Sequence, residues 1–320
     1  MSDVYAGVDI GGTNIKIGLV TGQRRLLGHA SIPTQPQDGV RQLVARSAQT
    51  IRDLAVQAKL RPGAVRGVGI GAPGPLDIRK DVIIFMPNIG WRNVPFTRLF
   101  AKELRVPAFT ENDANLAAWG EAWAGAGRNI DHFVLLTLGT GIGGGMVLDG
   151  KLWRGGSVSA AEIGHLTVVA DGEPCGCGAK GCLEAYASAT ALVKCYRRIA
   201  GKAPGAKALP EPVTAHAVCE AARRGDAPAK AAVDHVVKFL AIGITSCVKL
   251  IDPDKVILVG GMALAGDLIV KPLREQVKAI FAASFPFRPE VVVGKLGDRA
   301  GLYGAAGWAW WNVTKQGRAR

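Results

Sequence analysis

The chain has 320 residues, with 39 basic and 26 acidic side chains that give a formal net charge of +13. Its hydrophobic content of 48% is ordinary for a globular protein that buries a core, and its length suits two domains or one large one. No run of about eighteen uncharged apolar residues occurs, so we expect no membrane span. The basic residues are dispersed rather than interleaved with aromatics in one run, so we expect no nucleic-acid site.

The chain opens with a strand-like pattern. Residues 4–9 are apolar, and Gly11, Gly12 and Thr13 separate them from a second apolar segment, IKIGLV. This pattern predicts two strands joined by a glycine turn. Because strand-like sequence begins at residue 4, we expect no secretory signal and a cytoplasmic protein.

Helices and strands are predicted to alternate over the next hundred residues or so. Residues 40–59 place apolar side chains on one helical face, which indicates an amphipathic helix. We then predict a buried strand ending in a Gly-Pro turn at 66–77, a helix at 96–104, a strand at 106–112 and a helix at 113–125.

Residues 133–150 (FVLLTLGTGIGGGMVLDG) repeat the opening pattern of strand, glycine-rich turn and strand. The repeat suggests a duplicated architecture with two lobes, and the alternative is two unrelated hairpins. Helices are predicted at 185–200 and 227–251, with a polar connection that contains Gly and Pro between them.

The last third of the chain continues the alternation. We predict a strand, a double glycine and a helix start at 254–266, a strand at 290–297 and a helix at 301–311. A chain of alternating strands and helices belongs to the α/β class.

Three cysteines and a histidine stand close together in the segment EIGHLTVVADGEPCGCGAKGCLE, at His165, Cys175, Cys177 and Cys182. One imidazole and three thiolates form the closed ligand set of a structural zinc site. The alternatives are a disulfide, which we do not expect without a secretory signal, or small buried residues. Cys195, Cys219 and Cys247 are scattered in helix-like segments and are expected to fill the core.

Two further features suggest a ligand. Backbone amides in glycine-rich turns can bind phosphate oxygens, and the two predicted turns could hold a polyphosphate although neither matches a P-loop. Glu111, Asn112 and Asp113 follow a strand and precede a helix, a position that favours exposed catalytic groups, and Asn112 and Asp113 could also be an ordinary helix cap. From spacing alone the cap is favoured.

The motif E-x-G-H, followed by C-x-C-G-x-x-G-C-x-E, resembles the signature of the ROK family of sugar kinases and sugar-responsive repressors. The resemblance runs from Asp9 to about Gly261. It implies the two-lobe actin-like ATPase and sugar-kinase (ribonuclease H-like) fold, with sugar and nucleotide in an interdomain cleft. It places a small lobe at 1–115 and a large lobe with the zinc loop at 116–320, and the C-terminal helix is expected to pack back on the first lobe.

The resemblance also implies roles for single residues. It makes Asp113 the catalytic base and reverses the preference for a helix cap. The implied sugar contacts are Gly74, Asn88, Asn112, Asp113, Glu162, His165 and Glu184. The implied contacts to ATP and its Mg²⁺ are Asp9, Gly11, Gly12, Thr13, Lys16, Gly139, Thr140, Gly141, Gly143, Gly260 and Gly261.

We therefore expect an ATP-dependent kinase of the 6-hydroxyl of glucose, with mannose also plausible as a substrate, that uses Mg²⁺ and a structural Zn²⁺ and forms a homodimer or higher homo-oligomer. N-acetylmannosamine or N-acetylglucosamine is the alternative sugar, and polyphosphate as a donor stays open. A sugar-responsive regulator is a remote alternative, because those repressors carry a DNA-binding segment ahead of the first hairpin. A third possibility is a sugar-binding protein that zinc stabilises and that has no catalytic activity.

Overall fold

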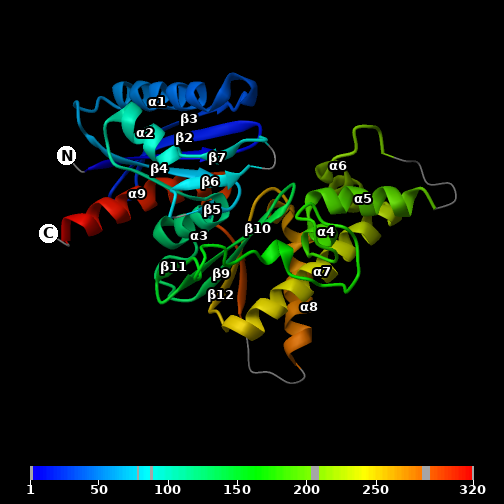
Figure 1. The fold of residues 1–320 in the computed structure, drawn as a ribbon. Coiled ribbons are helices and arrows are strands. Elements are labelled where there is room, and N and C mark those ends of the chain that lie inside the picture. The colour runs from blue at the N-terminus through cyan, green and yellow to red at the C-terminus, as the bar shows by residue number, and fades with distance from the viewer. Residues whose placement is uncertain (1–2, 78, 87–88, 203–208, 283–288, 319–320) are drawn as a thin grey trace. The chain divides into compact units, whose positions relative to one another are not determined.

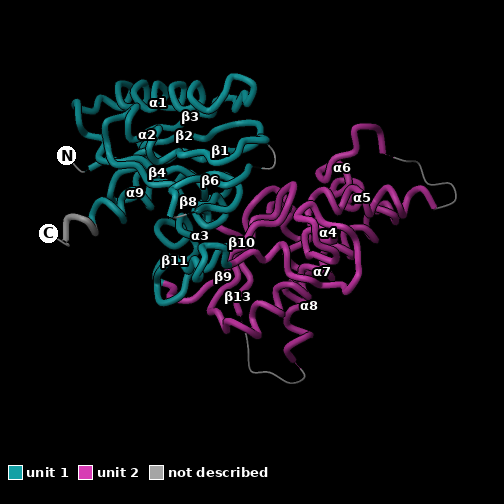
Figure 2. The backbone as a smooth tube through the Cα atoms, in the orientation of Figure 1, with its two compact units in different colours: residues 1–129, 145–160, 295–320 teal, residues 130–144, 161–294 magenta. Residues whose placement is uncertain are grey.

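The computed structural model describes residues 3–77, 79–86, 89–202, 209–282 and 289–318 (Figure 1). The predicted sugar contact Asn88 lies outside the described residues. Strands and helices alternate along the chain, so the predicted α/β class is confirmed. The chain divides into two compact units: unit 1 contains residues 1–129, 145–160 and 295–320, and unit 2 contains residues 130–144 and 161–294 (Figure 2).

Unit 1 is built on a five-stranded sheet with the order β3-β2-β1-β4-β8. The first three strands are antiparallel, and β4 and β8 run parallel to β1. The strands are β1 (Val4–Ile10), β2 (Asn14–Thr21), β3 (Leu26–Pro33), β4 (Val65–Ala72) and β8 (Ala108–Asn112). A small antiparallel sheet joins β5 (Leu76–Asp77), β6 (Val82–Phe85) and β7 (Arg92–Val94).

Helices cover both faces of this sheet, because successive side chains of a strand point to opposite sides. On β1, Val4 packs in the core that contains Leu43 of α1 (Gly39–Gln57) and Phe96 of α2 (Phe96–Leu104). Its neighbour Tyr5 packs instead with Leu302 of α9 (Ala300–Arg318). Figure 1 shows α1 and α2 on one side of the strands and α9 on the other.

Glycines let α9 lie directly on the sheet and on α3 (Asp113–Ala124). A Cβ at Gly69 of β4 would lie 1.8 Å from the carbonyl oxygen of Ala305, and one at Gly304 would lie 1.7 Å from that of Leu116. Atoms cannot approach so closely, so only glycine permits this packing. A Cβ at Gly301 would lie 2.4 Å from an Asp9 carboxylate oxygen, so the carboxyl end of β1 lies beside the start of α9.

The second sheet has the order β11-β10-β9-β12-β13. Its strands are β9 (Phe133–Leu138), β10 (Ile142–Leu148), β11 (Lys151–Trp153), β12 (Lys255–Val259) and β13 (Glu290–Val293). When the strands of each sheet are counted in chain order, both sheets place them side by side as third, second, first, fourth and fifth. This identical order supports the predicted duplication.

The helices of unit 2 pack around α7 (Ala227–Ile251). These are α4 (Glu184–Ala187), α5 (Ala189–Ala200), α6 (Ala215–Arg223) and α8 (Val270–Ala282). Within the described residues, α7 is the one helix whose length and composition would suit a membrane span, but 61% of that stretch is buried inside the protein. Its apolar composition is therefore explained by its place in a core.

Some predicted elements differ from the structure. We predicted a polar connection between the helices at 185–200 and 227–251, but its residues 215–223 form the helix α6. Thr214 caps this helix, because its side chain accepts a hydrogen bond from the Ala217 amide at 3.1 Å. The predicted helix at 185–200 breaks at Ser188, whose extended backbone and hydroxyl cap α5. The boundary predicted at residue 116 lies inside α3, whereas unit 1 is formed from three separate segments.

Candidate active site

The glycine turn between β1 and β2 is held from outside by Thr34. The Thr34 hydroxyl donates a hydrogen bond to the Gly11 carbonyl at 2.7 Å, and its amide donates to the Thr13 carbonyl at 2.9 Å. The turn is also closed by the Gly11 amide, which donates to the Asn14 carbonyl at 3.0 Å. Thr13 itself is exposed and so can contact a ligand.

Asp9 lies at the carboxyl end of β1, in register with Gly71 of β4. Burial raises the pKa of Asp9 to about 7, and the negative charges of Asp113 and Asp298 add to this rise while Lys16 opposes it. A Cβ at Gly71 would lie 3.6 Å from an Asp9 carboxylate oxygen and 3.7 Å from the Asp113 Cα. The two predicted acidic residues are therefore neighbours at the same end of the sheet.

Lys16, a predicted phosphate contact, is paired with Asp298 of η4 (Gly297–Arg299). Its ammonium donates to the Asp298 carbonyl at 2.5 Å and to the Asp298 carboxylate at 3.2 Å. Both side chains are substantially exposed. The pair links the first hairpin to the start of α9.

Asn112 and Asp113 hold the start of α3 (Asp113–Ala124) in different ways. Asn112 is the cap of α3, because its side-chain oxygen accepts hydrogen bonds from the amides of Ala114 at 2.9 Å and Asn115 at 3.1 Å. Asp113 is the first helical residue, and one of its oxygens also accepts from the Ala114 amide. The Asn112 amide group donates to the carbonyl of Gly74, another predicted sugar contact, at 3.4 Å.

Glu111 is a buried carboxylate that supports this strand end. It accepts hydrogen bonds from the Asn112 amide at 2.9 Å and the Asn115 side chain at 3.2 Å, and it pairs with Arg154 at 3.4 Å. Burial raises the pKa of Glu111, and these donors and the Arg154 charge lower it. The Arg154 guanidinium also lies over the ring of Trp308, 5.4 Å from its centroid.

In unit 2, the turn between β9 and β10 carries the second predicted phosphate site. The Gly139 amide donates to the Gly141 carbonyl at 3.0 Å, and the Gly143 amide donates to the Thr137 hydroxyl at 3.0 Å. A Cβ at Gly139 would meet no atom within 4 Å, so this side of the turn is open.

The double glycine after β12 lies at the same sheet end, since Val259 pairs with Thr137. Gly260 has a φ of +95°, and a Cβ there would lie 2.5 Å from the Leu138 carbonyl oxygen. Gly261 is exposed with open space beside it. The structure thus brings the predicted nucleotide contacts of unit 2 together.

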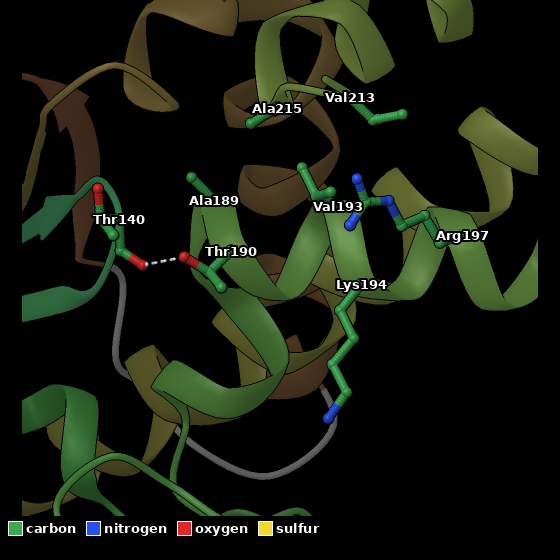
Figure 3. Close-up of a pocket in the computed structure, with 8 residues that line it drawn as sticks. All are labelled: Thr140, Ala189, Thr190, Val193, Lys194, Arg197, Val213 and Ala215. Atoms are coloured by element: carbon green, nitrogen blue, oxygen red, sulfur yellow. Dashed lines mark hydrogen bonds between the residues drawn. The ribbon is translucent and has the colours of Figure 1, made fainter. Parts of the chain in front are cut away.

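A cavity of about 570 Å³ begins at this turn (Figure 3). Aliphatic side chains and two cationic ones surround it, and one of its walls is the first half of α5. Lys194 and Arg197 are paired with Glu173 and Glu211, each at 2.6 Å. The lining residues are Thr140, Ala189, Thr190, Val193, Lys194, Arg197, Val213 and Ala215.

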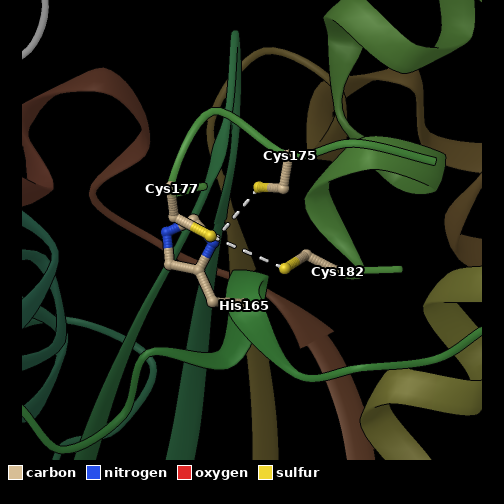
Figure 4. A group of neighbouring side chains, drawn as sticks. All are labelled: His165, Cys175, Cys177 and Cys182. Atoms are coloured by element: carbon tan, nitrogen blue, oxygen red, sulfur yellow. Dashed lines mark hydrogen bonds between the residues drawn. The ribbon is translucent and has the colours of Figure 1, made fainter. Parts of the chain in front are cut away.

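The four predicted metal ligands converge (Figure 4). Their ligand atoms all lie within 4.8 Å of one another, with 3.7 Å between the sulfurs of Cys177 and Cys182 and 3.5 Å between Cys175 Sγ and His165 Nδ1. A zinc tetrahedron has edges of about 3.8 Å between sulfurs and about 3.5 Å between sulfur and nitrogen. The sulfurs of Cys177 and Cys182 lie farther apart than the about 2.05 Å of a disulfide bond, and the geometry of the four ligand atoms fits zinc.

The thiols of the cluster differ in acidity. Burial, followed by hydrogen bonding with Cys177 and Cys175, raises the pKa of Cys182 to about 12. The backbone amide of Ala179 is the main cause that lowers the pKa of Cys177. A metal must therefore displace a tightly held proton, and its affinity should increase with pH.

The sugar-reading residues predicted in unit 2 lie around this cluster. His165 ends η2 (Ile163–His165) and turns Nδ1 toward the sulfurs, so its Nε2 stays available. Glu162 occupies the N-cap position of η2 and is exposed. One Glu184 oxygen accepts a hydrogen bond from the Ile142 amide at 2.8 Å, and the other lies 3.8 Å from Cys175 Sγ.

Comparison with known proteins agrees with this arrangement. The ROK family model matches residues 5–311. The chain belongs to the ROK family. It is 40% identical to a glucokinase of Thermotoga maritima over 309 residues, covering 94% of this chain and 95% of that protein.

Two solved structures of the family are also similar to this ROK protein. A ROK hexokinase from Thermus thermophilus aligns with a TM-score of 0.85 and 34% identity, over 98% of this chain and 99% of that one. A ROK glucokinase from Streptomyces griseus, solved with glucose and AMPPNP, aligns with a TM-score of 0.80 and 35% identity, over 96% and 99%. The fold is that of the actin-like sugar kinases.

Several supporting residues of this ROK protein were not predicted. Thr34, Glu111 and Arg154 hold the predicted residues of unit 1. The Tyr186 hydroxyl accepts a hydrogen bond from the Glu173 amide at 2.6 Å and so holds the metal loop. These contacts join residues far apart in sequence. The expectation that Glu111 is exposed was wrong, because its carboxylate is buried at the end of β8 and bonded to Asn112, Asn115 and Arg154.

Proposed function

We propose that this ROK protein is an ATP-dependent kinase that phosphorylates the 6-hydroxyl of glucose. Its likeness over nearly the whole chain to proteins named glucokinase carries this proposal. The neighbouring carboxylates Asp9 and Asp113 at one sheet end supply the acidic groups that phosphoryl transfer needs.

The nucleotide is assigned to the two glycine turns and the cavity. The turn at Gly139–Gly143 is open beside Gly139, and glycines let phosphate oxygens approach the backbone of such a turn closely. The cavity begins at Thr140 and has aliphatic walls, which suit the flat apolar faces of a nucleotide base. Gly260 and Gly261 are assigned to the adenosine end, and Gly11 to Thr13, with Lys16, to the phosphates from unit 1.

Magnesium would be held near Asp9, where it neutralises charge on the nucleotide phosphates. Ionised Asp9 is costly in the free protein because burial and two acidic neighbours oppose it. A cation at this position would therefore meet a carboxylate whose charge the fold leaves poorly compensated.

The sugar is assigned to Gly74, Asn88, Asn112 and Asp113 together with Glu162, His165 and Glu184. Asp113 would orient the 6-hydroxyl and accept its proton as general base. Asn112 supplies the side-chain cap of α3, and the bond from the Ala114 amide fixes one Asp113 oxygen at the start of the same helix. The zinc cluster would fix His165 with its Nε2 hydrogen available to a sugar hydroxyl.

Kinetics with a panel of sugars test the proposal. Purified protein with MgATP should release ADP with the highest kcat/KM for glucose, and mannose should be second. A preference for N-acetylmannosamine or N-acetylglucosamine would move the assignment to the alternative substrates, and a preference for polyphosphate over ATP would change the donor. Absence of sugar-dependent ADP release would reject a kinase and favour a sugar-binding or regulatory protein.

Location and assembly complete the proposal. The cluster of free thiols is compatible with a reducing compartment, which supports a cytoplasmic location. A homodimer or higher homo-oligomer is expected from the family resemblance. Light scattering after gel filtration measures the mass directly, and a monomer at working concentration would contradict the expectation.

A further inference from the structure

Glu184 contacts two parts of unit 2 that have different assigned roles. Its Oε2 accepts the Ile142 amide hydrogen at 2.8 Å, and its Oε1 lies 3.8 Å from Cys175 Sγ in the metal cluster. Ile142 is the residue at which β10 leaves the phosphate-binding turn. A residue assigned to the sugar therefore also holds the end of the nucleotide turn.

Two glycines make this contact possible. A Cβ at Gly141 would lie 2.3 Å from Glu184 Oε2, so a side chain there would displace the carboxylate. A Cβ at Gly164 would lie 1.9 Å from the Ile142 carbonyl oxygen. Ile142 is thus held by Glu184 at its amide and closely covered by the Glu162–His165 segment at its carbonyl.

The start of α5 holds the other end of the same turn. The Thr190 hydroxyl donates a hydrogen bond to the Thr140 carbonyl at 2.8 Å, as Figure 3 shows. The Ala189 amide donates to the Gly139 carbonyl at 2.9 Å. Three backbone groups of the turn, at residues 139, 140 and 142, are therefore bonded to the segment 184–190.

We propose that Glu184 and Thr190 are positioning residues that fix the phosphate-binding turn for the nucleotide. This inference rests on the proposed function and deepens it. A backbone turn binds phosphate well only when its amides already point at the ligand, because ordering a loose loop reduces affinity. The charged Glu184 acceptor contributes most, since hydrogen bonds to ionised groups are stronger than neutral ones.

The test measures binding of MgAMPPNP by calorimetry in the absence of sugar. We expect Glu184→Ala to weaken binding about tenfold and Thr190→Val about threefold, in line with the loss of a charged and a neutral hydrogen bond. Thr190→Ser keeps the hydroxyl and should restore the affinity. A residue that only reads sugar would leave this measurement unchanged.

Matched controls separate this effect from general damage. Glu162→Ala removes a second predicted sugar-reading carboxylate that is exposed and does not contact the turn, so MgAMPPNP affinity should stay within about twofold while glucose affinity falls. Thr50→Val removes a similar hydrogen bond, from the Thr50 hydroxyl to the Arg46 carbonyl in α1, and should leave the MgAMPPNP affinity unchanged. Zinc content is measured in each variant, and if Glu184→Ala loses zinc, Thr190→Val and its serine rescue decide the question.

The outcomes distinguish two failures. If the wild-type protein binds no MgAMPPNP and releases no ADP with glucose, the proposed function itself is wrong. If it binds and turns over, but zinc-loaded Glu184→Ala and Thr190→Val bind MgAMPPNP as tightly as wild type, the kinase stands and the positioning role is rejected.

Discussion

At the scale of single residues, Asp9 is a carboxylate that the fold makes costly to ionise. Burial, Asp113 and Asp298 raise its pKa to about 7, while a carboxyl in an unfolded chain titrates near pH 3.9. The folded state therefore binds more protons than the unfolded state between these two pH values. Stability that depends on Asp9 must fall as the pH rises from about 4 to 7 and stay low above it.

Asp9→Asn should therefore stabilise the protein free of nucleotide and Mg²⁺ at pH 8 and have little effect at pH 4. The raised pKa of Asp9 limits the gain in the free energy of unfolding to about 4 kcal/mol. The gain should be smaller than this limit because the residue is only half-buried. Urea unfolding at both pH values measures it, with the exposed Asp267→Asn as control. A loss of stability at pH 8, accompanied by retained activity, would contradict the assigned role.

Single residues also show what the sequence could and could not predict. The pair Asn112 and Asp113 was recognisable as either a cap or a catalytic group, and only the structure assigns the cap to Asn112. The family resemblance pointed to Asp9, and its nearness to Asp113 follows from strands β1, β4 and β8 being parallel neighbours. The partnership of Glu111 with Arg154 could not be predicted, because the two residues are 43 positions apart, with α3, β9, β10 and β11 between them.

At the scale of elements, the metal loop is a case in which the sequence alone was sufficient for the prediction. Its four ligands lie within 18 residues of sequence, so spacing and residue type predicted a convergence that the structure confirms. Local geometry was enough here because the loop folds on itself, closed by the Gly181 amide donating to the Glu173 carbonyl at 2.8 Å. The missed helix α6 and the break at Ser188 each depend on one capping side chain, Thr214 and Ser188, and a lone serine or threonine in an alanine-rich stretch is also compatible with a continuous helix or a loop.

Cys177→Ser should lose about one zinc per chain and destabilise unit 2, because a closed metal site contributes its binding energy to folding. Elemental analysis and thermal unfolding measure the two effects, and kinase activity should fall with them. Cys219→Ser makes the same chemical change in α6, away from the cluster, and should keep the zinc. A Cys177→Ser protein with wild-type stability and activity would show that the cluster has no structural role.

At the scale of the whole chain, the duplicated pattern was visible because each half begins with strand, glycine turn and strand. The identical strand order of the two sheets then supports a duplication. The division into units was harder to predict, because residues 145–160 and 295–320 return to unit 1. Such returns depend on close packing, such as that of Gly304 against Leu116, which no local pattern encodes.

The central claim is that this ROK protein transfers phosphate to glucose with Asp113 as the general base. The direct measurement is glucose 6-phosphate formation from MgATP by wild type and by Asp113→Asn, with glucose affinity determined by calorimetry. We predict one glucose 6-phosphate per ADP for the wild type. The variant should show a kcat lower by at least about a hundredfold and glucose binding changed only modestly. Near-normal turnover by Asp113→Asn, or ADP release without glucose 6-phosphate, would contradict the account.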